Sequence, residues 1–186
     1  MKKRNAVHTL CILALLTAMM VLLSLTVSIR TPYFKLTLGS LPVVLAAMLF
    51  GPLEGAAVAV LGEFMVQLLS YGLMPTTVIW ICPPAIRALV VGGAAIWMRR
   101  QGRRLEERPV VCYGVCVAGA VLTTVGNTVG MWLESLMYRT SFAAAAFWVP
   151  SRFVSGIATA MVVATACMPL TCGLRRSGVL GLEERA

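Results

Sequence analysis

The chain consists of long apolar segments separated by short stretches that hold most of its charges, prolines and glycines. Apolar runs that approach or exceed ~20 residues are typical of helices that span a bilayer. Strands of a membrane barrel are shorter and alternate polar with apolar residues, which these segments do not. The pattern therefore predicts six helices, at residues 6–29, 36–51, 53–70, 77–98, 110–136 and 147–174.

Prolines mark two of the breaks between these segments. Thr31-Pro32 follows the first segment, and Gly51-Pro52 forms a tight break between the second and the third. Segments 36–51 and 53–70 are short, so we expect one or both to tilt little or to cross the bilayer incompletely.

Composition agrees with a membrane location. The chain has 186 residues, of which 59% are hydrophobic and 12% are charged. The charged share is about half that of soluble domains. With neither a Gly/Ser-rich linker nor a convincing internal repeat, residues 1–186 are expected to form one domain. The predicted fold class is an all-α integral membrane protein, a compact bundle of six transmembrane helices.

The positive charges indicate the orientation in the membrane. Because cytoplasmic loops are enriched in Lys and Arg, we expect both termini and the loop after the fourth segment on the cytoplasmic side of a prokaryotic plasma membrane. The net charge of +9 is then mainly a topology signal, with weak attraction to anionic lipids, and indicates no nucleic acid. A cleaved signal peptide is an alternative for the first segment, although the run is long for one. The cytoplasmic charges are Lys2, Lys3, Arg4, Arg99, Arg100, Arg103, Arg104, Arg108, Arg175, Arg176 and Arg185.

Catalytic groups are scarce. The single histidine, His8, lies at the edge of the first segment, and the chain has no aspartate. A phosphate-binding loop of the type G-x-x-x-x-G-K-[ST] is also missing, so any ATP would be used by partner subunits. We therefore expect no catalytic residues, no cofactor in this chain and no enzymatic activity.

Six cysteines raise the question of a metal. Cys112, Cys116, Cys167 and Cys172 lie at similar depth near the cytoplasmic ends of two segments, but they lack the C-x-x-C spacing of a structural site. Buried free thiols that pack as small apolar side chains explain them better, and no metal site is predicted.

Two opposite charges lie at the same depth inside the predicted bilayer. Arg87 and Glu63 are each about ten residues, or ~15 Å, from the start of their segments. A lone charge at that depth costs at least ~2.5 kcal/mol, so we expect an ion pair between them, with Gln67 as a further partner of Glu63. The pair could clasp two helices together or take part in ligand binding.

Polar and aromatic residues gather in the outer half of the predicted bundle. For the aromatic ones an interfacial belt is the alternative to a binding role. Together they could line an outward-opening pocket for a flat heterocycle that carries an anionic group. The candidate ligand-binding residues are Arg30, Tyr71, Trp80, Arg87, Asn127, Trp132, Trp148 and Arg152.

The stretch LGSLPVVLAAMLFGPLEGAAVAVLGE, residues 38–63, resembles the second and third helices of S components, the substrate-binding subunits of energy-coupling factor (ECF) vitamin transporters. Folate-type members are the most similar ones in these motifs. The matching residues are Leu41-Pro42, Phe50-Gly51-Pro52, Gly55 and Glu63, with glutamate where the family usually has aspartate; Ala14 and Ala18 match the family's A-x-x-x-A pair on the first helix.

This resemblance implies a function. The chain would bind a vitamin or precursor, folate-like or another heterocycle, at the outer face. It would associate with a transmembrane coupling subunit, which docks at Ala14 and Ala18, and with two cytoplasmic ATPases. A membrane-embedded enzyme and a purely structural membrane subunit are the two alternatives.

Overall fold

The structure is a computed structural model, and it describes residues 6–27, 29–30, 35–36, 38–139, 147 and 149–177. Six α-helices dominate it, with one 3₁₀ turn and one pair of two-residue strands. The elements are α1 (Ala6–Thr26), β1 (Ile29–Arg30), β2 (Lys35–Leu36), α2 (Ser40–Leu49), α3 (Pro52–Tyr71), α4 (Thr77–Arg100), η1 (Leu105–Glu107), α5 (Pro109–Tyr138) and α7 (Val149–Arg176).

The predicted all-α fold with six helices is confirmed, and the helix boundaries lie within a few residues of those expected. Five of the described helices are long and apolar enough to cross a membrane, as expected of a multi-pass membrane protein. The exception, α2, has 10 residues and a length of about 15 Å, half the thickness of a bilayer core. The first segment was expected to reach residue 29, but α1 ends at Thr26 and Ile29 pairs with Leu36 in an antiparallel ladder.

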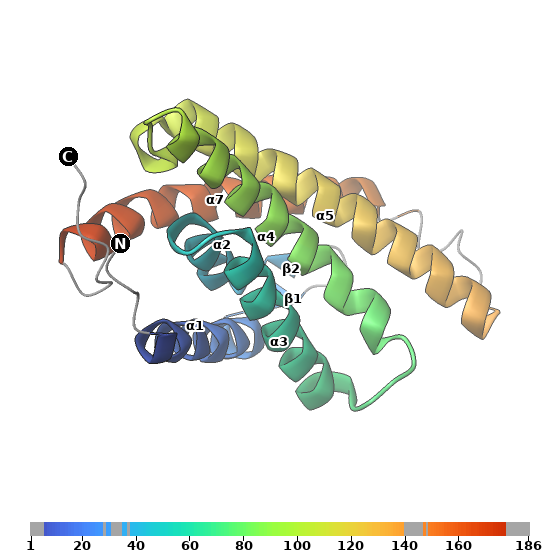
Figure 1. The fold of residues 1–186 in the computed structure, drawn as a ribbon. Coiled ribbons are helices and arrows are strands. Elements are labelled where there is room, and N and C mark those ends of the chain that lie inside the picture. Colours follow the sequence, from blue (N-terminus) through green and yellow to red (C-terminus); the bar gives the residue numbers. More distant parts are fainter. Residues whose placement is uncertain are drawn as a thin grey trace.

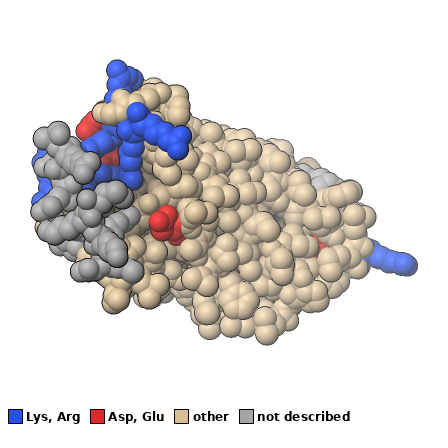
Figure 2. All heavy atoms as spheres, in the orientation of Figure 1, with Lys and Arg blue, Asp and Glu red and all other residues tan. Residues whose placement is uncertain are grey.

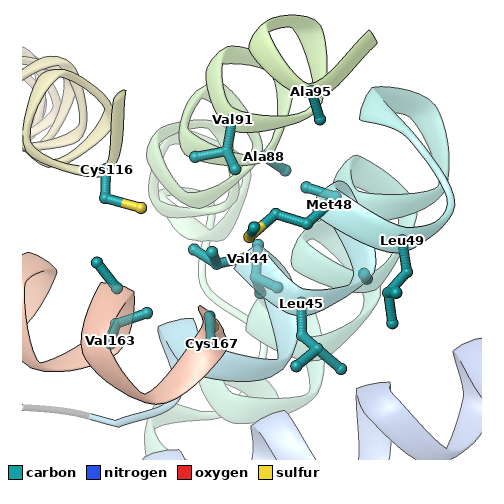
Figure 3. Packing of buried hydrophobic residues seen from close by; sticks show 14 of the residues in the cluster. Val44, Leu45, Met48, Leu49, Ala88, Val91, Ala95, Cys116, Val163 and Cys167 are labelled. Carbon is teal, nitrogen blue, oxygen red and sulfur yellow. The ribbon is translucent and has the colours of Figure 1, made fainter. Parts of the chain in front are cut away.

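The short helix α2 forms the centre of the bundle. It contacts α1, α3, α4 and α7, and residues 42–49 are all buried (Figure 1). Val44 and Met48 of α2 point toward α4, while Cys167 approaches from α7 (Figure 3). An uninterrupted apolar sequence suits this position, because every face of α2 meets another helix rather than lipid.

The connection between α2 and α3 depends on Gly51 and Pro52. Gly51 has φ = 133°, a backbone conformation that residues with a Cβ rarely adopt, and Pro52 occupies the first turn of α3, where its missing N–H costs nothing. Gly55 then lets α3 pack tightly on α2, since an added Cβ would lie 2.7 Å from the Cβ of Ala47. The predicted tight break is therefore confirmed, and it folds α3 back against α2.

Most of the described basic side chains gather at one end of the molecule, near the α4–α5 connection (Figure 2). There Arg99 donates hydrogen bonds from Nη2 to the carbonyls of Met48 and Leu49, which end α2. Arg175 of α7 forms an ion pair with Glu106, with Nε and Oε1 2.9 Å apart, although neither atom has an aligned hydrogen bond. Nη2 of Arg175 also donates to the carbonyl of Met48 at 3.5 Å, so these contacts tie the ends of α2, α4 and α7 together. That this end faces the cytoplasm remains a prediction.

Candidate functional site

One face of α4 points into the bundle. Val78 and Leu89 are 70% and 46% exposed, and they lie about three turns apart on the outward face. Arg87 follows Val78 by nine residues, about two and a half turns, and so lies on the opposite, inward face. Trp80 and Val91 share that face. Trp80 and Arg87 are half-buried, whereas Val91, one turn deeper, is completely buried.

The same change from partly accessible to buried occurs on α5 and α7. Asn127 of α5 and Arg152 of α7 face the interior and are half-buried. Cys116 and Val163, each about three turns deeper on the same faces, are 3% and 2% exposed. These half-buried side chains thus keep accessible surface in the predicted outer half, whereas helix packing buries Val91, Cys116 and Val163 below them, which form a closed layer. The candidate site lies among α4, α5 and α7, above this closed layer.

Arg87 is fixed by a side chain of α5. Its Nε donates to Oγ1 of Thr123 at 3.4 Å, and that hydroxyl donates to the carbonyl of Gly119 at 2.6 Å. Gly119 makes room for the stem of Arg87, since a Cβ there would lie 3.4 Å from Cγ of the arginine. The sequence analysis missed Thr123, although its i,i+4 spacing from Asn127 was a signal that both share one helix face.

The two prolines of α4 interrupt its hydrogen bonding just above Arg87. Pro83 and Pro84 have no N–H, so the carbonyl of Trp80 has no donor three or four residues ahead. Pro83 packs against Gly126 of α5, where an added Cβ would lie 3.5 Å from the proline ring. Irregular backbone at membrane depth is tolerated where it is buried in protein or lines a cavity, which fits the inward face of the candidate site.

The other candidate residues occupy different environments. Nη1 of Arg152 lies 2.8 Å from the sulfur of Met131 on α5, a weak acceptor. Tyr71 and Trp132 are 57% and 48% exposed, which suits the interfacial belt that was the alternative for aromatic residues. The side chain of Arg30, the whole of Trp148 and the Thr31-Pro32 break lie outside the described part of the chain. A ligand-binding role for these residues stays a prediction.

Each member of the predicted ion pair has a hydrogen bond to another side chain. Oε1 of Glu63 accepts from Nε2 of Gln67 at 3.2 Å, as expected for two residues one turn apart. Arg87 is bonded to Thr123 on the opposite neighbour, α5. Gln67 is therefore a partner of Glu63, and a direct contact between Glu63 and Arg87 stays a prediction.

Two further sets of residues from the sequence analysis are the alanine pair of α1 and the cysteines. Ala14 and Ala18 are exposed on α1, on a face that is otherwise apolar. Cys112, Cys116 and Cys167 are buried as expected, but Cys172, which was also expected to be a buried thiol, is exposed near the end of α7. The described residues contain no group of three or more His, Cys, Asp or Glu that could hold a metal ion.

Comparison with known proteins agrees with this architecture. Residues 4–176 match the family described as "ECF-type riboflavin transporter, S component". The chain belongs to this family. The resemblance to S components is confirmed, and an enzymatic role is excluded because family members are transporter subunits. No curated protein matches.

Solved structures show the same fold. FolT bound with folic acid has a TM-score of 0.63 and 20% identity, over 91% of this chain and 97% of that one. ThiT from Listeria monocytogenes has a TM-score of 0.67 and 18% identity, over 92% and 96%. An S component for biotin has a TM-score of 0.65 and 15% identity over 100% of both chains. At these identities the likeness establishes the S-component fold alone.

Proposed function

We propose that this S component captures riboflavin at the outer face of a prokaryotic plasma membrane and delivers it to an ATP-driven transporter. The match of residues 4–176 to the riboflavin S-component family carries this proposal. A folate-like or another heterocyclic vitamin is the second candidate, since FolT has the same fold.

The chemistry of the candidate site supports a flat, polar-edged ligand. The inward faces of α4, α5 and α7 present one indole, Trp80, and three hydrogen-bonding side chains, Arg87, Asn127 and Arg152. Binding sites for small ligands combine apolar walls with a few such polar groups. Riboflavin offers both a planar ring system and carbonyl, ring-nitrogen and hydroxyl groups that these side chains could bind.

Uptake also requires partners. With no phosphate-binding loop in its sequence, the protein would depend on two cytoplasmic ATPases for energy. The transmembrane coupling subunit would dock on the exposed face of α1, where Ala14 and Ala18 allow close approach of another helix. In this arrangement both termini are cytoplasmic, and ligand enters from the opposite face.

Ligand binding by the purified protein tests the proposal. Riboflavin fluorescence should be quenched on titration with the detergent-solubilised protein, and the melting temperature should rise with riboflavin concentration. At 100 times the dissociation constant, binding stabilises the folded state by about 2.7 kcal/mol. Folic acid and biotin serve as comparison ligands, and ribitol at equal concentration as the control.

The outcomes separate the candidates. Stabilisation by folic acid or biotin but not by riboflavin would reject riboflavin as the ligand. A protein that responds to no vitamin would fit the alternative of a structural membrane subunit.

A further inference from the structure

Part of the guanidinium of Arg87 has no hydrogen-bond acceptor among the described residues. A guanidinium carries five N–H groups in one plane, and within the described part of the chain only the Nε–H of Arg87 has an acceptor, Thr123. Among the described residues none accepts a hydrogen bond from its two Nη groups. Thr123 cannot rotate away freely, since its own hydroxyl is engaged with Gly119. The bond at Nε therefore sets the orientation of the guanidinium plane and leaves its Nη edge available.

The position of this edge matches the accessible interior. Arg87 faces away from the exposed side of α4 and yet is half-buried, directly above the buried Val91. Trp80 lies two turns, about 10 Å, outward on the same face. Unused N–H donors at this depth are costly, so they need acceptors from water, from Glu63 or from a ligand.

The geometry of a guanidinium edge favours one kind of acceptor. Two parallel N–H groups suit two acceptors side by side, and arginine reads guanine in DNA through such a pair, the carbonyl oxygen O6 and the ring nitrogen N7. The isoalloxazine ring of riboflavin has the same arrangement in O4 and N5. The pterin ring of folic acid has it as well, at atoms with the same names.

We propose that the Nη edge of Arg87 binds the carbonyl oxygen O4 and the ring nitrogen N5 of the ligand, with Thr123 as the residue that positions the guanidinium. This inference rests on the proposed function, and it defines the ligand class as heterocycles that carry a carbonyl next to such a nitrogen. The proposal also sets the depth and direction of the ligand's ring system. The O4/N5 edge of the ring lies next to the closed layer, and the rest of the ring extends outward toward Trp80.

A change in the ligand tests this without altering the protein. In 5-deazariboflavin a C–H group replaces N5, so one of the two acceptors is lost. We expect the wild-type protein to bind it about 10- to 100-fold more weakly than riboflavin, the range for a hydrogen bond to a charged group. Folic acid and 5-deazafolic acid form the matching pair if the protein takes folates. Equal affinity for both members of the pair that it binds would overturn the inference.

Substitutions then identify the donor. Arg87→Met and Arg87→Lys should each weaken riboflavin binding and abolish the preference over 5-deazariboflavin, since lysine keeps the charge but has no planar fork. Thr123→Val should reduce this preference. Arg100→Lys, at the exposed end of α4, is the control and should keep it.

The results distinguish three situations. If Arg87→Met retains the full preference for riboflavin, another residue reads N5 and the inference is wrong. If Arg87→Met lowers only the melting temperature and leaves the affinity for riboflavin unchanged, Arg87 holds helices together rather than binding the ligand. That result would also contradict the inference. Wild-type protein that binds neither riboflavin nor folic acid would refute the proposed ligand class itself. If the Arg87 variants do not fold, the inference is still tested by comparing riboflavin with 5-deazariboflavin on the wild-type protein.

Discussion

The contact between α4 and the start of α3 allows a sharp test of the helix packing. Gly92 and Gly93 are neighbours on α4, but their surroundings differ. A Cβ at Gly92 would lie 2.5 Å from both Cα and N of Pro52, whereas a Cβ at Gly93 would have no atom within 4 Å. The substitutions Gly92→Ala and Gly93→Ala therefore make the same chemical change, one against backbone and one in open space.

The expected difference follows from that geometry. Both substitutions gain the same helix propensity, up to about 1 kcal/mol in water, so this contribution cancels between them. Ordinary carbon contacts are about 3.5–4.0 Å, so Gly92→Ala forces the backbones of α3 and α4 apart by roughly 1 Å. Overpacking of this kind costs about 1–3 kcal/mol. The clash cannot be relieved by a side-chain rotation, because the atoms of Pro52 that it meets include backbone.

Thermal unfolding in one detergent measures the difference. Gly92→Ala should melt below Gly93→Ala by about 2–12 °C, taking about 2–4 °C per kcal/mol for a chain of this size. Equal melting temperatures, or a higher one for Gly92→Ala, would refute the close approach of α3 and α4 at Pro52.

Three further variants address other parts of the molecule. Glu106→Gln removes the charge that faces the mostly buried Arg175, and it should lower the free energy of unfolding by about 1–3 kcal/mol in thermal or denaturant unfolding; no loss would show that the pair contributes nothing. Pro84→Ala returns an N–H donor to α4, and it should raise the melting temperature while weakening riboflavin binding. If both the melting temperature and the affinity are unchanged, the interruption of the hydrogen bonds of α4 at Pro84 affects neither stability nor binding. Replacing Ala14 and Ala18 with Leu should abolish uptake in cells and leave riboflavin binding by the purified protein intact; loss of binding as well would place α1 in the ligand site rather than at the coupling subunit.

The sequence by itself determined the number of helices and their approximate positions, because a segment in lipid must satisfy its own backbone hydrogen bonds and a long apolar run can do so only as a helix. It also determined the break at Gly51-Pro52, since few residues other than glycine adopt a φ of 133° and proline suits the first turn of a helix. The S-component family was recognisable from the same stretch, and the family match over residues 4–176 confirmed it.

Only the tertiary structure decided which face of each helix points inward. Membrane helices are apolar on all sides, so hydrophobic periodicity cannot distinguish a lipid-facing side chain from an interior one. Trp80 and Trp132 looked equivalent in the sequence, but one lies on the inward face of α4 and the other is 48% exposed on α5. The hydrogen bond from Arg87 to Thr123 joins residues 36 positions apart, and it depends on the packing of α4 against the glycines of α5. Contacts of this kind arise from the way that complete helices fit together, which no local sequence pattern specifies.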